Sequence, residues 1–95
     1  MSKARESDDV VRLDNSRSVP RLDYRRVIEA VEQFLPTMLP DHSYSVETMV
    51  GQGIWRTPLK RHAGAIVAHA VRRGLLPLEF AYKGKRSTNL YQLRA

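Results

Sequence analysis

The stretch SVETMVGQGIWRTPLKRHAGAIVAHAVRRG, residues 45–74, decides the fold predicted for this chain. A very short extended piece is predicted at Tyr44, just before it. Ser45 is a good N-cap residue, and Glu47 lies in the first turn, where an acidic side chain favours a helix. Gly51 is predicted to end this first short helix, and the residues QGIW that follow are predicted to form a turn.

A longer helix is predicted over residues 58–73. Thr57 supplies its N-cap, and Pro58 takes the first helical position, where a missing N–H is harmless. Gly74 suits the left-handed residue that closes a helix, and Pro77 prevents its continuation. Apolar residues recur at helical spacing and predict one buried face, made by Ala63, Ile66, Val67, Ala70 and Val71. The stretch therefore predicts two helices joined by a tight, glycine-containing turn.

The apolar period then changes to two residues. Apolar and polar residues alternate in LEFAYK, residues 78–83, and again in TNLYQLRA, residues 88–95. GKRS, residues 84–87, supplies a turn between them. We therefore expect a β-hairpin with a basic tip.

Towards the N-terminus, LDYRRVIEAVEQFL, residues 22–35, predicts another helix. Asp23 is its expected N-cap, and Leu22 is expected to pack on Val27 as a hydrophobic staple. Pro36 breaks the helix, so that PTMLPDHS is predicted to be a connector.

The first 21 residues show neither helical nor strand periodicity. Charged residues, serine and asparagine dominate, with only scattered valine and leucine. We therefore predict a flexible N-terminal arm over residues 1–21 and one folded domain over residues 22–95. The segment VVRL, residues 10–13, leaves open a short pairing or docking segment.

The amino-acid composition indicates the cellular compartment in which the chain is expected. The chain has 95 residues and no cysteine, which favours one small domain without disulfides in a reducing compartment. The N-terminal segment has no apolar signal region, and no stretch is long and apolar enough for a membrane helix. A cytoplasmic location is the resulting expectation.

Charge divides the chain into two unequal parts. The net charge is +6, yet residues 1–51 carry seven Lys and Arg against nine Asp and Glu. Residues 52–95 carry nine basic residues against Glu79 alone. Such an excess repels itself, and a polyanion such as nucleic acid is the usual compensating partner. A solvated basic face without any partner is the alternative interpretation.

The order helix, short strand, helix, turn, long helix and hairpin resembles the winged-helix family of DNA-binding domains. The resemblance covers roughly residues 22–93 and lies in residues 45–78 followed by FAYKGKRSTNLYQL. RRGLLPL before a strand pair ending in YQL is also similar to small proteins of phages and other mobile elements. The resemblance implies an α+β winged helix of three helices with a C-terminal hairpin wing. It further implies a transcriptional regulator or accessory factor that binds double-stranded DNA.

In that family the helix before the wing usually enters the major groove, and the wing contacts the backbone or the minor groove. At 100° per residue, the outward face of the long helix is predicted to carry Arg61, Ala65, Ala68 and Arg72, with His69 beside them. The resemblance thus implies a DNA-binding set of Arg56, Thr57, Lys60, Arg61, Ala65, Ala68, His69, Arg72, Lys83, Lys85 and Arg86.

Structural roles compete with several of these assignments. Alanine is a good surface helix former and exposed arginines are often merely solvated, so the outward face can be explained without DNA. The Thr57 hydroxyl is better explained as a helix cap than as a phosphate contact. Trp55 is better explained as a plug between helices than as a base-stacking platform.

Other function classes have less support. The histidines at positions 42, 62 and 69 do not have the spacing of a zinc site, and no catalytic grouping or phosphate-binding loop is recognisable. No metal, cofactor or enzymatic activity is therefore expected. The main competitor is a winged-helix adaptor or inhibitor that docks on an acidic protein surface. A homodimer matching a palindromic site stays open.

Overall fold

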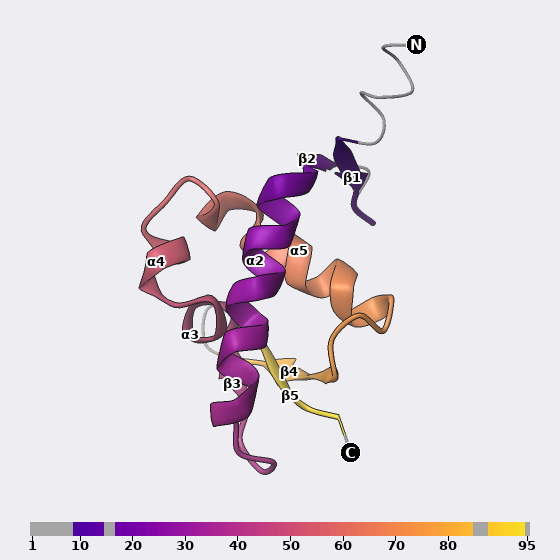
Figure 1. The fold of residues 1–95 in the computed structure, drawn as a ribbon. Coiled ribbons are helices and arrows are strands. Elements are labelled where there is room, and N and C mark those ends of the chain that lie inside the picture. The colour runs from indigo at the N-terminus through magenta and orange to yellow at the C-terminus, as the bar shows by residue number, and fades with distance from the viewer. Residues whose placement is uncertain (1–8, 15–16, 85–87, 95) are drawn as a thin grey trace.

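The computed structural model describes residues 9–14, 17–84 and 88–94. Over these residues the chain is a small α+β domain in which helices pack with two small antiparallel sheets (Figure 1). Its elements in chain order are β1 (Val10–Arg12), β2 (Ser18–Pro20), α2 (Arg21–Phe34), the 3-10 turn η1 (Leu35–Thr37), β3 (Tyr44–Ser45), α3 (Val46–Val50), α4 (Gln52–Trp55), α5 (Lys60–Arg72), β4 (Leu78–Lys83) and β5 (Asn89–Leu93).

The N-terminal strands β1 and β2 form an antiparallel hairpin in which Val11 pairs with Val19. Val19 is fully buried and Leu13 is only 3% exposed, so both belong to the hydrophobic core. The predicted flexible arm is therefore wrong for residues 9–14 and 17–21, and residues 1–8, 15 and 16 lie outside the described residues. Strands this short bury too few side chains to leave an alternating apolar pattern, so periodicity does not predict this hairpin.

Helix α2 begins where β2 ends. Pro20 is its N-cap, with φ −57° and ψ 141°, and Asp23 lies in the first turn instead of at the cap. Leu22 is 71% exposed, so the predicted staple on Val27 is wrong. The fixed φ of proline favours this direct passage from strand to helix. Val27 and Val31 are completely buried and form the side of the helix that faces the core.

The predicted cap residues Ser45 and Thr57 both make local hydrogen bonds, but α5 begins at Lys60 with Leu59 as its N-cap, so the predicted helix start at Pro58 with Thr57 as cap is wrong by two residues. The Ser45 Oγ accepts from the Thr48 N–H at 3.2 Å, which confirms the N-cap of α3. Gly51 follows at φ 79°, and the next four residues form the short helix α4 instead of a simple turn. The Thr57 Oγ accepts from the Leu59 N–H at 3.2 Å and donates to the Ile54 carbonyl at 2.7 Å.

The end of α5 agrees with the prediction. Gly74 adopts φ 72°, and its N–H donates to the Val71 carbonyl at 3.1 Å. The Leu75 N–H donates to the Ala70 carbonyl at 2.9 Å. These two bonds satisfy carbonyls that would otherwise lack partners at the helix end. A left-handed glycine thus turns the chain towards β4.

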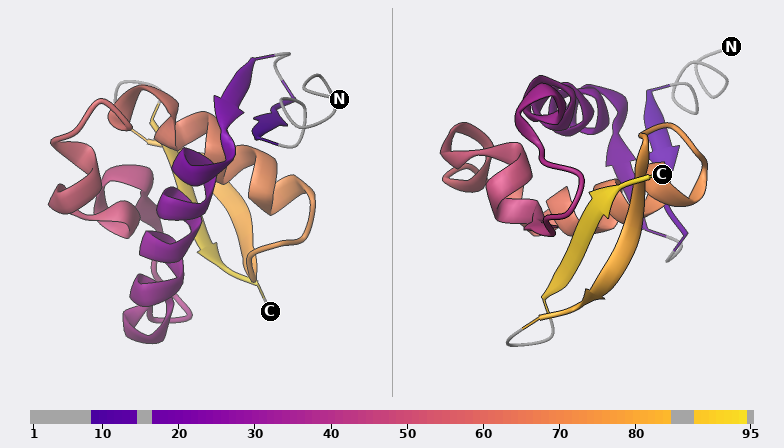
Figure 2. Two further views of the ribbon diagram at one scale, coloured as in Figure 1. Left: turned by 45° about the horizontal axis from the view of Figure 1, so that its top comes forward. Right: turned by 90° about the horizontal axis from the view of Figure 1, so that it is seen from below.

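The C-terminal strands form the predicted hairpin, and β3 adds a third strand in the order β3-β5-β4. Tyr91 of β5 lies between Tyr44 and Phe80 on its two neighbours. The register shifts between Phe80 and Tyr82. On the edge strand β4, Leu78 is buried, whereas Phe80 and Tyr82 are 50% and 55% exposed. Towards its tip the hairpin extends away from the helices (Figure 2).

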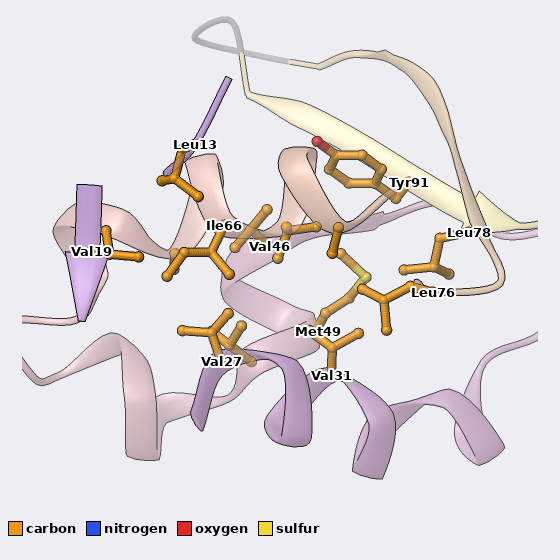
Figure 3. Close-up of a cluster of buried hydrophobic side chains, with 14 of the residues drawn as sticks. Leu13, Val19, Val27, Val31, Val46, Met49, Ile66, Leu76, Leu78 and Tyr91 are labelled. Atoms are coloured by element: carbon orange, nitrogen blue, oxygen red, sulfur yellow. The ribbon is translucent and has the colours of Figure 1, made fainter. Parts of the chain in front are cut away.

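The core lies where α2, α3 and α5 meet the two hairpins (Figure 3). Met49 from α3 and Ile66 from α5 are its largest fully buried side chains. Leu13 and Val19 extend this core under the N-terminal hairpin. Among the described residues, no helix is long and apolar enough to cross a membrane.

Candidate nucleic-acid interface

Part of the predicted outward face of α5, namely Ala65, Ala68 and Arg72, lies between the two hairpins. Ala65 and Ala68 are half-buried, and the Arg72 side chain is 68% exposed. Ala68 and Arg72 line a groove against the β4–β5 hairpin and also a smaller hollow against residues 13–14. Ala65 lines only the smaller hollow. Because the alanine side chains are small, the surface of α5 is recessed between the β4–β5 hairpin and residues 13–14.

Helix α5 and the hairpin meet in the larger groove, which has a volume of about 330 Å³. Arg72 of α5 and Lys83 of β4 line it together. No acidic residue lines it within the part of the chain that the structure describes. A cation from each element therefore faces the same space, which we call the α5–hairpin groove.

The predicted outward position of His69 is wrong. The residue is 7% exposed, and its Nδ1 lies 2.9 Å from the Tyr24 hydroxyl of α2. The two rings meet edge to face at 5.5 Å. Burial raises the pKa of the Tyr24 hydroxyl. Because α2 closes over this flank of α5, His69 is a packing residue and does not reach the groove.

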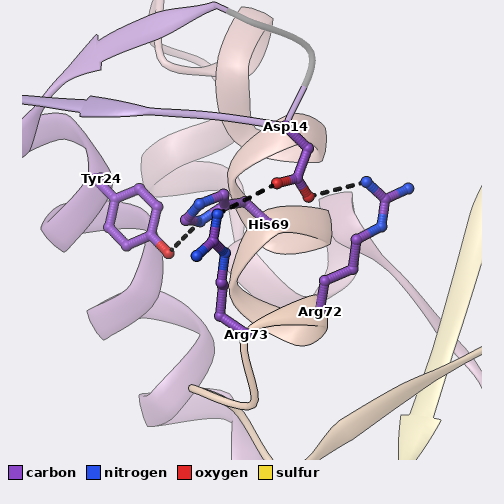
Figure 4. Close-up of polar contacts among 5 residues, drawn as sticks. All are labelled: Asp14, Tyr24, His69, Arg72 and Arg73. Atoms are coloured by element: carbon purple, nitrogen blue, oxygen red, sulfur yellow. Dashed lines mark hydrogen bonds and ion pairs between the residues drawn. The ribbon is translucent and has the colours of Figure 1, made fainter.

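Asp14 restrains the C-terminal arginines of α5 (Figure 4). Its Oδ2 accepts from Arg72 Nη1 at 2.9 Å, and its Oδ1 lies 3.8 Å from Arg73 Nη2. The hydrogen bond from Arg72 is the main cause that lowers the pKa of Asp14. The pair therefore stabilises the fold above the ordinary pKa of aspartate and ceases to do so as the pH falls through the lowered value.

The sequence gives no signal for this role of Asp14. It is one carboxylate in a segment of mixed charges, 58 residues before its partner Arg72. Only the packing of the N-terminal hairpin on α5 brings the two together. An anion thus already lies at the rim of the predicted basic surface.

The N-terminal end of α5 carries a separate group of cations. Arg61 lines a different hollow, which it shares with Asp23 and Arg26 of α2. The Lys60 Nζ lies 5.3 Å from the centre of the Trp55 ring, a cation–π contact. The Arg56 Nε donates to the Gln52 side chain at 3.3 Å. Arg61 and Arg72 thus lie at opposite ends of the helix and line different hollows.

The remaining predicted positions are Thr57, Lys85 and Arg86. Thr57 uses its hydroxyl within the turn before α5, whereas the N-cap of α5 itself is Leu59. Lys85 and Arg86 lie outside the described residues. The structure therefore brings Ala68, Arg72 and Lys83 into one groove.

Comparison with protein-family models, curated proteins and solved structures finds no match for this chain. Within the described residues, no group of three or more His, Cys, Asp or Glu side chains is placed to hold a metal ion. The function of this chain is therefore inferred from its own geometry and charge.

Proposed function

We propose that this chain is a winged-helix DNA-binding protein, a transcriptional regulator or accessory factor, that holds duplex DNA with α5 and the β4–β5 hairpin. Three packed helices, α2, α3 and α5, precede a hairpin whose sheet gains β3, and this order supports a winged helix. The observation that carries the proposal is that Arg72 and Lys83 line one groove free of acidic side chains among the described residues.

In the proposed complex, the half-buried alanines let the backbone of α5 approach the DNA. Arg72 and Lys83 bind phosphates at one end of the helix. The exposed Arg56, Lys60 and Arg61 bind phosphates at the other end. Such contacts position a protein on DNA without reading its sequence, so the target site depends on further base contacts.

The proposal predicts strong salt dependence. With about six phosphate contacts, the logarithm of the association constant should fall against the logarithm of salt concentration with a slope near −5. Fluorescence anisotropy with a labelled duplex of arbitrary sequence over a salt series measures this slope. Absence of binding at low salt would contradict the proposal and favour an acidic protein partner.

Removing the Asp14 carboxylate should strengthen DNA binding. Asp14→Asn releases Arg72 and removes a negative charge beside the groove, so affinity for duplex DNA should rise about twofold to fivefold. The gain is modest because solvent strongly screens an exposed ion pair. The measurement is the same anisotropy titration at low salt.

Asp9→Asn is the matched control for this variant. It changes the same charge on the same hairpin, and Asp9 lines neither hollow beside α5. An equal gain in both variants would show that only net charge matters. Loss of affinity in Asp14→Asn would show that Asp14 orients Arg72 for binding.

A further inference from the structure

The α5–hairpin groove has an aromatic wall as well as cations. Phe80 of β4 lines it and is 50% exposed. Its ring meets the Tyr91 ring edge to face, with centroids 6.1 Å apart and planes at 79°. Tyr91 is 2% exposed and therefore belongs to the core. A buried ring thus supports Phe80 while half of the Phe80 surface stays open.

The polar residues around Phe80 suit a nucleotide. Arg72 and Lys83 supply positive charge, and Asn89 of β5 offers an amide that both donates and accepts hydrogen bonds. Ala68 and Val71 form an apolar part of the lining. The groove thus combines an open ring, a hydrogen-bonding amide and two cations.

Duplex DNA alone does not explain the exposed ring. In a duplex the faces of the bases are covered by stacking, and a protein reaches only base edges, sugars and phosphates. An unpaired base has a free face that can stack on an aromatic side chain while neighbouring cations hold the backbone. Phe80 with Arg72 and Lys83 has this combination.

We propose that the α5–hairpin groove binds single-stranded DNA, with one unpaired base stacked on Phe80 and the flanking phosphates on Arg72 and Lys83. This inference rests on the proposed DNA-binding function and extends it from plain duplex to DNA with an unpaired segment. The absence of acidic lining residues in the described chain favours a polyanion over an uncharged apolar peptide.

Three labelled probes test the inference by anisotropy at fixed salt. They are a blunt duplex, the same duplex with a thymidine overhang, and the same duplex with an overhang of abasic nucleotides. The thymidine overhang should bind about fivefold to a hundredfold tighter than the abasic overhang, because only the former offers a base to stack. Both overhangs carry the same phosphates, so charge cannot produce this difference.

Phe80→Ala should abolish the preference for the thymidine overhang over the abasic overhang. Tyr82→Ala is the matched control, since Tyr82 is an exposed aromatic residue on the same strand that does not line the groove. It should keep the preference. Phe80→Leu, which retains an apolar side chain on Tyr91, guards against a loss caused by misfolding and should also lose the preference.

Equal affinity of the wild type for both overhangs would overturn this inference and leave duplex binding intact. Equal loss of preference in Phe80→Ala and Tyr82→Ala would also overturn it, because the groove would not be the source. Failure to bind any of the three probes would instead reject the proposed function itself.

Discussion

Replacing Leu13 with alanine is expected to lower the free energy of unfolding by about 2–5 kcal/mol. Leu13 is 3% exposed and belongs to the same core cluster as Val19, Val27 and Ile66. The substitution removes buried methyl groups and leaves a cavity that the surrounding side chains fill only in part. In a domain this small, such a loss is a large share of the total stability. Urea denaturation followed by circular dichroism measures it.

Leu22→Ala is the control for this experiment. It makes the same chemical change in the neighbouring element, at a residue that is 71% exposed, and should alter stability by less than about 0.5 kcal/mol. Sequence periodicity predicts the larger loss of stability for Leu22→Ala, because it places Leu13 in a flexible arm and Leu22 in a hydrophobic staple. If the two variants unfold at the same urea concentration, the N-terminal hairpin does not pack on the core in solution.

The double variant Arg72→Glu/Lys83→Glu is expected to weaken duplex binding on the order of a hundredfold at low salt. Two attractive contacts with phosphate become repulsive ones on both walls of the α5–hairpin groove. The slope of affinity against salt should become shallower by about two, since each phosphate contact contributes about one. The same anisotropy series measures the affinity and the slope.

Arg25→Glu/Arg94→Glu is the matched control, because it changes the net charge of the chain by the same amount as Arg72→Glu/Lys83→Glu. Arg25 is exposed on α2 and Arg94 follows β5, and neither lines the groove. This pair should lose far less affinity than the groove pair. Similar losses in both double variants would mean that DNA binding follows overall charge and does not involve the groove. Arg72→Gln/Lys83→Gln separates lost contacts from any unfolding that a second carboxylate beside Asp14 would cause.

Local features of the fold were predictable from the sequence. Ser45 as an N-cap, Gly51 and Gly74 with positive φ, and the change to strand periodicity after Pro77 all have the predicted place. Each depends on backbone geometry within a few residues, which the side chain at that position controls directly. Which side chains of β4 are exposed was less predictable. Their exposure depends on the register shift between Phe80 and Tyr82 and on the position of β4 at the edge, and both are properties of the whole sheet.

The candidate site was predicted only in part. The winged-helix resemblance implied one DNA-binding set that included Ala68, Arg72 and Lys83, and the structure brings these three residues into one groove. His69 was misplaced because helical projection gives an angle around the axis, whereas burial depends on which neighbour closes over that angle. Here the neighbour is Tyr24 of α2.

The sequence by itself predicted α2, β3, α3, α5 and the β4–β5 hairpin in this order, and it shows the excess of positive charge in the C-terminal half. These follow from interactions between residues close together in the chain. Only the tertiary structure decided that the N-terminal segment joins the core, that His69 is buried and that Asp14 binds Arg72. His69 is 45 residues from its partner Tyr24 in the chain, and Asp14 is 58 residues from Arg72. Contacts over such distances form only when the packing of the whole core places the elements side by side.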